Sequence, residues 1–214
     1  MDVAVVGGGP AGISACLELS KSANLKIALF ESDEELGGIP RTQHIFFFGF
    51  RDRKRIYTGR AYARKLNRLI RNTSVEIHTQ ATVRNIIPGD PGKLHRVDAV
   101  SGGGLDFYKS RFVLLATGCF ESPRAPRLIP GTRPAGIFTV GELQKLVNLH
   151  HVKAGKRALI IGSEHVIFPC VLTLRRAGTS IAGIVEEHPE LQTYPTMVRA
   201  MGSFFGFPIY CLFH

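Results

Sequence analysis

Cysteine is scarce in this chain of 214 residues. Its four cysteines, at positions 16, 119, 170 and 211, form no CxxC motif. Zinc knuckles, iron–sulfur sites and disulfide-dense secreted folds need closely spaced cysteines, so the sequence disfavours all three. Long apolar runs are absent too: the stretch from Val3 to Leu17 contains four glycines and a proline and is too short to span a bilayer. Because no basic region precedes it, we expect no signal peptide and a reduced, cytoplasmic protein.

Acidic residues are few where basic residues gather. Between Arg41 and Arg71 the chain has ten Lys or Arg residues and a single acid, Asp52, so nearly all of the net charge of +10 lies there. Apolar residues from Tyr62 to Ile70 have helical spacing, which predicts an amphipathic helix. A solvated helix face explains the charge, and docking of an anion or a partner is the alternative. We expect no nucleic-acid partner, because no zinc finger, heptad pattern or RNA-binding motif is present.

The N-terminal segment combines a strand, a glycine-rich turn, a helix and a second strand. Val3–Val6 is a short apolar run typical of a buried parallel strand. Residues 13–22 have the apolar spacing of a helix, and residues 25–30 predict a strand that ends at Glu31. The first strand and the helix are joined by a turn with Gly-x-Gly-x-x-Gly spacing, whose residues are Gly7, Gly8, Gly9, Pro10, Ala11 and Gly12.

In this context the glycine turn is a dinucleotide-binding fingerprint. The first glycine permits a tight turn, the second lets the backbone approach a pyrophosphate, and the third lets helix and strand pack closely. The phosphates then lie at the helix N-terminus. Glu31 follows Gly7 by 24 positions and can accept hydrogen bonds from the adenosine ribose hydroxyls. We therefore expect a dinucleotide cofactor at this turn.

A second strand–turn–helix–strand pattern follows downstream. Residues 157–161 predict a strand, residues 166–177 a helix, and residues 180–185 a strand that ends at Glu186. Gly162 precedes Glu186 by 24 positions, the spacing of the first pattern. The sequence therefore predicts an α/β protein with two Rossmann-like doubly wound units.

Between these patterns the sequence predicts more strands and a linker. Strands are expected at residues 74–78, 81–87 and 111–116. The Pro-rich stretch at residues 123–134 is typical of a linker between domains.

Several motifs resemble those of FAD-dependent oxidoreductases. They are the turn at residues 7–12, a second glycine pair within residues 35–38, and the strand end at residues 115–118. Together they resemble the pyridine-nucleotide–disulfide oxidoreductase superfamily, which includes the thioredoxin reductases. Residues 129–139 and 162–166 are similar to those of flavoprotein subunits of amine-oxidising complexes, namely opine oxidase, hydrogen cyanide synthase, proline dehydrogenase and the alpha chain of sarcosine oxidase.

The resemblance implies a set of FAD-binding residues. The glycine turn would contact the pyrophosphate, Glu31 the ribose, Gly38 with Ile39 the flavin side, and the backbone of Val83 the adenine. The complete set is Gly7, Gly8, Gly9, Pro10, Ala11, Gly12, Glu31, Ser32, Gly37, Gly38, Ile39, Val83, Ala116, Thr117 and Gly118. Val83 is equally explained as a core residue, and the second glycine pair as a plain turn.

The resemblance also implies an FAD-binding domain at residues 1–118 and a second, NAD(P)-binding-like domain at residues 119–214. In the second fingerprint Glu164 and Ile167 replace the glycines that a pyrophosphate needs, so NADH binding is left open and a structural or docking domain is favoured. The chain ends inside an expected strand and lacks a late Gly-Asp motif of the superfamily. We therefore expect an incomplete C-terminal part, completed by further sequence or by a partner.

No catalytic residue and no metal site are predicted. Cys119 follows the strand end and is expected to be a small buried hydrophobe. Residues 45–50 form an apolar run that is explained either as a wall of the flavin site or as a core strand. The histidines at positions 150, 151 and 188 have no partners at metal-ligand spacing.

The resemblance implies an FAD-dependent oxidoreductase, namely the flavoprotein subunit of an amine- or imino-acid-oxidising dehydrogenase complex. It implies a small-molecule redox substrate, an electron acceptor other than NADP and a partner flavoprotein subunit, without an integral membrane segment. One alternative is an NADH-dependent, thioredoxin-reductase-like flavoprotein without the redox disulfide. The other is a non-catalytic assembly module.

Overall fold

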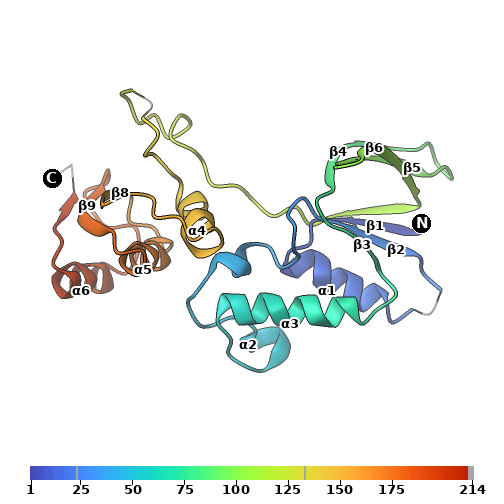
Figure 1. Cartoon of the computed structure of the whole chain (residues 1–214), viewed down its shortest axis with the longest axis horizontal. Coiled ribbons are helices and arrows are strands. Elements are labelled where there is room, and N and C mark those ends of the chain that lie inside the picture. The colour runs from blue at the N-terminus through green and yellow to red at the C-terminus, as the bar shows by residue number, and fades with distance from the viewer. Residues whose placement is uncertain (23, 133, 212–214) are drawn as a thin grey trace. The chain divides into compact units, whose positions relative to one another are not determined.

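The computed structural model describes residues 1–22, 24–132 and 134–211 (Figure 1). The chain divides into two compact units. The first comprises Met1–Arg41 and Phe46–Cys119, and the second comprises Thr42–Ile45 and Phe120–His214. The first unit thus ends within one residue of the proposed domain boundary, whereas residues 42–45 join the second unit.

A four-stranded parallel sheet forms the centre of the first unit. Its strand order is β3-β2-β1-β7, so that β1 lies between β2 and β7. The strands are β1 (Val3–Val6), β2 (Ile27–Phe30), β3 (Glu76–His78) and β7 (Phe112–Leu115). In such a sheet, ligands bind at the carboxyl ends of the strands, where the order of connection reverses. The turn after β1 lies at this edge.

Alternate residues of the sheet face two different cores. Val5 and Leu29 pack against α1 (Pro10–Leu19) and α3 (Gly59–Arg71) on one face. Ala28 and Phe30 face an antiparallel meander on the other face, as Figure 1 shows. The meander consists of β4 (Thr82–Ile87), β5 (His95–Ser101) and β6 (Gly104–Ser110). Both faces are covered, which explains why β1 and β2 are apolar throughout.

The predicted amphipathic helix of the basic segment is confirmed as α3. Tyr62, Leu66 and Ile70 are buried, and Arg64 and Arg68 are exposed. The Thr58 hydroxyl accepts a hydrogen bond from the backbone N–H of Ala61 (3.3 Å), which caps the start of the helix. Two short elements precede α3: the 3₁₀ helix η1 (Ile39–Thr42) and the one-turn helix α2 (Phe50–Arg53).

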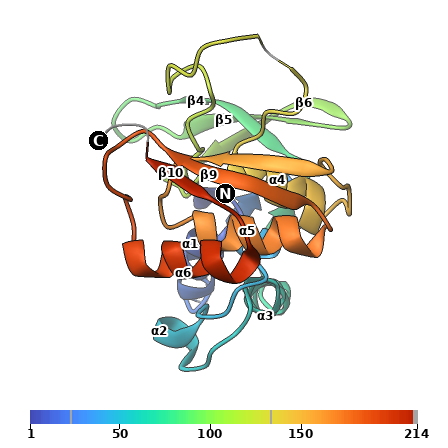
Figure 2. The same cartoon turned by 90° about the vertical axis from the view of Figure 1, so that its left-hand side faces the viewer.

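The second unit is built on a three-stranded parallel sheet of order β10-β9-β8. Its strands are β8 (Arg157–Ile161), β9 (Ser180–Glu186) and β10 (Ile209–Cys211), and its helices are α4 (Val140–Asn148), α5 (Ile167–Arg176) and α6 (Pro195–Phe205). Figure 2 shows α5 and α6 on the same face of the sheet. Val171, Ile184 and Val198 are fully buried between these layers. The second Rossmann-like unit is therefore confirmed.

Buried amides hold residues 42–45 in the second unit. The Gln43 amide donates to the Gln144 side-chain oxygen (2.6 Å), and the Asn148 amide donates to the Thr42 carbonyl (2.7 Å). Buried polar groups of this kind are costly unless they are paired, so these bonds fix the position of the segment. Within the described ranges, no helix is long and apolar enough to cross a membrane.

Candidate functional site

The turn between β1 and α1 requires glycine at two positions. Gly7 has a φ of +106°, and a Cβ at this residue would overlap the Ala116 carbonyl oxygen. A Cβ on Gly12 would overlap the Gly7 carbonyl oxygen, so helix and strand meet at backbone contact. Both glycines are therefore required by the fold itself, whether or not a ligand is bound.

Gly9 differs from its neighbours because neither its backbone conformation nor its surroundings require glycine. Its φ of −76° is accessible to any residue, and a Cβ there would come no nearer than 4.0 Å to the Cα of Gly38. The space beside Gly9 is therefore open. A side chain at this position would not strain the turn, and the missing side chain leaves room for a ligand.

Helix α1 begins at this open space without a side-chain cap. Gly9 is the N-cap residue and Pro10 follows it inside the helix. Since proline lacks an N–H and glycine has no side chain, the N–H groups of the first turn and the positive end of the helix dipole point to the solvent side. Such a terminus binds phosphate groups. The residues present thus fit the pyrophosphate of a dinucleotide.

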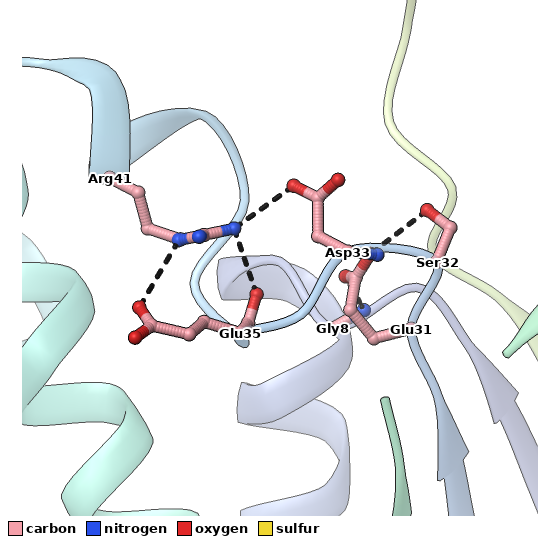
Figure 3. Close-up of polar contacts among 6 residues, drawn as sticks. All are labelled: Gly8, Glu31, Ser32, Asp33, Glu35 and Arg41. Carbon is pink, nitrogen blue, oxygen red and sulfur yellow. Dashed lines mark hydrogen bonds and ion pairs between the residues drawn. The ribbon is translucent and has the colours of Figure 1, made fainter. Parts of the chain in front are cut away.

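Glu31 connects the end of β2 to this turn (Figure 3). The residue is 9% exposed, and its carboxylate accepts hydrogen bonds from the backbone N–H groups of Gly8 (2.8 Å) and Asp33 (2.9 Å). The Ser32 hydroxyl donates a third bond (3.1 Å). A carboxylate has about four acceptor sites, so one remains for a ribose hydroxyl, and rotation of Ser32 frees a second.

A salt bridge from Arg41 holds the loop that follows Glu31. The guanidinium donates to the Asp33 carboxylate (2.9 Å) and to the Glu35 carbonyl (3.0 Å), as Figure 3 shows. Only 14% of the Arg41 side chain is exposed against 40% of the Asp33 side chain, so this pair is partly shielded from solvent. In the sequence Arg41 stands out only as the start of the basic segment. Its role in positioning the loop has no local sequence signal, because it depends on contacts made across the fold.

The second glycine pair lies against the first turn. The Gly37 N–H donates to the Gly8 carbonyl (2.7 Å), and a Cβ on Gly38 would lie 3.0 Å from the Cα of Gly9. Both glycines have positive φ, +125° and +56°. The pair therefore forms a turn and at the same time borders the open space beside Gly9, so both interpretations of its role stand. Ile39, which follows it, is 60% exposed.

The remaining predicted residues lie on neighbouring strand ends. The Ala116 N–H donates to the Val6 carbonyl (2.8 Å), which places the end of β7 beside Gly7. Thr117 and Gly118 continue from there and are exposed. Val83 is half-buried in β4 and packs against the meander core. The Ala81 N–H donates to the Glu31 backbone carbonyl (2.9 Å), so the chain leading to Val83 starts beside the end of β2.

Two expectations near this site are corrected. Cys119 is exposed, so the prediction of a small buried hydrophobe is wrong; nothing packs on it because β7 ends at Leu115. Residues 45–50 form no strand, so the core-strand interpretation is also wrong. An apolar hollow of about 390 Å³ lies there instead, and its lining includes Pro10, Phe47, Phe48, Phe50 and Tyr62. The interpretation of this run as a wall of the flavin site stays a prediction. No group of three His, Cys, Asp or Glu side chains in the described ranges is placed to hold a metal ion.

The second turn repeats the first with different chemistry. Gly162 has a φ of +100°, and the carboxylate of Glu186 is buried and accepts a hydrogen bond from the His188 N–H (3.1 Å). Here the Ser163 hydroxyl donates to Glu186. Burial opposes ionisation of Glu186, but these hydrogen bonds outweigh it and lower the pKa of its carboxyl.

The two residues that replace glycines in the second turn have separate roles. Ile167 is buried at the start of α5, where it packs into the core. Glu164 is exposed and forms an ion pair with Arg127 (3.3 Å). Helix α5 also begins without a side-chain cap, but two side chains stand here where the first turn has glycine.

An open helix N-terminus, an acid bound to the turn, and a parallel sheet backed by an antiparallel meander define a dinucleotide-binding protein of the flavoprotein class. The chain belongs to the pyridine nucleotide-disulphide oxidoreductase family, whose pattern matches residues 1–203. This membership confirms the expected superfamily and its Rossmann-like α/β fold.

Several individual proteins are similar to this chain in sequence or in structure. The chain is 30% identical over 190 residues to hydrogen cyanide synthase subunit HcnB of Pseudomonas aeruginosa, a match that covers 85% of this chain and 38% of the relative. It is 25% identical to an opine oxidase subunit of Agrobacterium tumefaciens, covering 94% of this chain and 42% of the relative. The structure of L-proline dehydrogenase from P. horikoshii superposes with a TM-score of 0.74 at 26% identity, covering 91% of this chain and 37% of that one. The chain thus spans less than half the length of these relatives.

Proposed function

We propose that this chain is the FAD-binding portion of a flavoprotein subunit in a complex that oxidises an amine or an imino acid. The open helix N-terminus beside Gly9, with Glu31 bound to the same turn, carries the FAD assignment. The substrate class is supported by the relatives, which include subunits of opine oxidase and sarcosine oxidase together with an L-proline dehydrogenase. A partner subunit is part of the proposal because three of these relatives are named as subunits.

Each predicted residue has a place in this proposal. The first turn of α1 binds the pyrophosphate, Glu31 and Ser32 bind the ribose, and Gly38 with Ile39 borders the flavin side. Gly7, Gly8, Gly12, Gly37 and the end of β7 at residues 116–118 shape the backbone around the cofactor, and the backbone of Val83 faces the adenine. FAD, when bound, supplies the acceptor for the electrons removed from the substrate. The protein contributes position and electrostatics.

The NADH-dependent alternative predicts nucleotide binding at the second turn. The Ser163 hydroxyl donates a hydrogen bond to the Glu186 carboxylate, and the buried Ile167 stands in the place of the third glycine. Both observations favour a second unit that binds NADH weakly or not at all. Titration with NADH tests this, and tight binding by the unaltered protein would establish the alternative. A cytoplasmic location stays a prediction.

The FAD assignment is tested at Gly9. Purified protein is expected to be yellow, and Gly9→Val is expected to weaken FAD binding roughly tenfold to a hundredfold, the effect of about 1–3 kcal/mol of steric overlap. Folding is expected to persist, because the backbone of Gly9 accepts any residue and its surroundings are open. Flavin absorbance and FAD titration give the affinity, and circular dichroism confirms the fold.

The matched control is Gly102→Val in the same unit. Gly102 also has no heavy atom within 4 Å of a built Cβ and no positive φ, but it lies in the β5–β6 turn. This variant is expected to retain FAD at the parent affinity. If Gly9→Val binds FAD as tightly as the parent, the pyrophosphate does not lie at this turn. A stable parent protein that is colourless and takes up no FAD supports the assembly module instead.

A further inference from the structure

Residues 46–56, here named the aromatic–basic loop, are firmly attached at their base. The backbones of Phe48 and Tyr57 pair through two hydrogen bonds (2.9 and 3.2 Å). The ring of Phe48 stacks on Tyr62 of α3, and the Tyr62 hydroxyl donates to the Asp52 carboxylate (2.9 Å). Burial and the neighbouring Asp52 raise the pKa of Tyr62 to about 12, so the hydroxyl keeps its proton for this bond. The loop therefore has a fixed conformation.

The other aromatic rings of the same loop are exposed, and two of them, Phe47 and Phe50, also line the hollow beside Pro10. Phe47 is 83% exposed, Phe50 65% and Phe46 60%, and Ile56 beside them is 57% exposed. Phe47 has a φ of +87°, a left-handed conformation that costs a bulky residue about 1–2 kcal/mol. Random exposure of single apolar residues is common, but four in one short, ordered loop indicate a surface that is covered by something else.

Positive charge surrounds these rings. Arg51, Lys54 and Arg55 are exposed, and none of them has an ion-pair partner in the described ranges. The acid of the loop, Asp52, is already shared between Arg53 (3.1 Å) and the Tyr62 hydroxyl. The loop thus presents three uncompensated cations together with apolar rings, and its charge is complementary to an anionic surface.

We propose that the aromatic–basic loop docks this protein on the surface of a bilayer that contains anionic phospholipid. The rings of Phe47 and Phe50 would enter the interfacial region, and Arg51, Lys54 and Arg55 would face the headgroup phosphates. Apolar rings flanked by cations are the usual anchors of proteins that lie on a membrane without spanning it.

The geometry favours a bilayer over an acidic protein partner. The loop projects from the unit at α2, beyond α3 on the side away from the sheet (Figure 1). A bilayer accepts separate, protruding rings, whereas a protein partner needs a contiguous, shape-matched patch from which lysine is depleted. Lys54, exposed among the rings, fits the headgroup region better than the centre of a protein interface.

The first test is cosedimentation of the full chain with phosphatidylcholine vesicles prepared with and without phosphatidylserine. Binding is expected only with phosphatidylserine and is expected to weaken as salt is raised. Replacing Arg51, Lys54 and Arg55 with Glu is expected to reduce partitioning roughly a hundredfold or more. The control is the same change at three exposed cations of the second unit, Lys156, Arg157 and Arg176, which alters the net charge equally and is expected to have a much smaller effect.

The second test follows one aromatic ring directly. Since the chain has no tryptophan, Phe47→Trp creates a single indole reporter. Its emission is expected to shift to shorter wavelength on adding phosphatidylserine vesicles and to be quenched by brominated lipid chains. Phe204→Trp is the matched control, because Phe204 is 82% exposed and lies on α6 of the second unit. Its emission is expected to remain that of an indole in water.

Three results would overturn the proposal. The first is a lack of binding to phosphatidylserine vesicles. The second is an equal loss of binding in both charge-reversed variants, since this indicates adhesion through net charge alone. The third is an unshifted Phe47→Trp emission in the bound state, which indicates that the loop faces something other than the bilayer. Flavin content, measured on each variant, keeps these outcomes separate from the FAD assignment.

Discussion

The two strand–turn–helix–strand segments of this protein share a backbone plan and differ in what fills the turn. Residues related by 155 positions make the same bonds: Gly7 donates to the Phe30 carbonyl (2.8 Å), and Gly162 donates to the Val185 carbonyl (2.7 Å). Glu31 and Glu186 each accept a hydrogen bond from the backbone two residues further on. In each unit, an acid at the end of the second strand therefore reaches the turn.

The side chains at the turn create the difference. In the first unit the backbone N–H of Gly8 binds the acid, and in the second the hydroxyl of Ser163 does so and also accepts the Gln192 N–H (2.7 Å). The helix begins three residues after Gly7, at Pro10, but five residues after Gly162, at Ile167. Because a bulky side chain at Ile167 cannot rest on the turn carbonyl as Gly12 does, the second helix starts later.

This comparison separates the requirements of the fold from those of ligand binding. The Rossmann-like layers form with either turn, so the fold tolerates Ser163 and Ile167. The turns differ in their side chains: the space beside Gly9 is open, whereas the second turn carries Ser163 and the buried Ile167. We therefore propose that cofactor binding depends on the side chains that are missing from the first turn, and the following changes test this proposal.

The largest effect is expected where the two turns differ in packing. Gly12→Ala introduces a Cβ that overlaps the Gly7 carbonyl oxygen, a backbone atom that cannot swing away. We expect a loss of about 3 kcal/mol or more of unfolding free energy, together with loss of flavin. Urea denaturation measures the first and absorbance the second. Gly103→Ala, where a Cβ meets only the Ser101 hydroxyl at 3.8 Å, is the control. An unchanged denaturation midpoint for Gly12→Ala would show that helix and strand can separate at this point.

A smaller effect is expected at Glu31. Glu31→Ala leaves the N–H groups of Gly8 and Asp33 without an acceptor. Each buried group left unpaired lowers the unfolding free energy by about 1–3 kcal/mol. Both the unfolding free energy and the FAD affinity are therefore expected to fall.

Glu31→Gln separates these two effects. Its carbonyl oxygen can accept from Gly8, so most of the stability is expected to return, whereas FAD is expected to bind about tenfold more weakly than to the parent. Isothermal titration with FAD and thermal denaturation of both variants measure the two quantities. Parent-like FAD affinity in Glu31→Gln would mean that the carboxylate serves only the turn.

Much of this arrangement was predictable from the sequence, since it follows from local signals. The apolar runs at residues 3–6 and 157–161 form the expected strands, of which the first is buried throughout and the second only at Ile160. The equal spacing of glycine and acid predicted both turns. The helix α1 starts at Pro10 rather than at residue 13, because proline suits the first turn of a helix and the turn glycines are drawn into it.

The errors arose where long-range contacts decide the outcome. The apolar run at residues 45–50 contains both Phe48, which packs on Tyr62, and Phe47, which points outward, and no periodicity distinguishes the two. The Ser163–Glu186 bond could not be anticipated either, because it joins residues 23 positions apart through a turn whose shape depends on Ile167. The spacing between glycine and acid identified the carboxylate of each unit, but it did not identify the group that donates a hydrogen bond to that carboxylate.

The smallest expected effect concerns that bond. Ser163→Ala removes the hydroxyl that donates to Glu186, and we expect a loss of about 1.5 kcal/mol of unfolding free energy near neutral pH. The pKa of Glu186 lies below its usual value in the folded protein, so its ionised form stabilises the protein above a pH of about 4.5, and this contribution disappears as the pH falls through the lower, folded pKa. The difference in unfolding free energy between parent and variant is therefore expected to be largest at neutral pH and to decrease in acid. Urea denaturation across this pH range measures it, with Glu186→Gln as the variant in which the pH dependence from this group is absent. A difference that stays constant with pH would show that the hydroxyl stabilises the turn through Gln192 alone and not through the carboxylate.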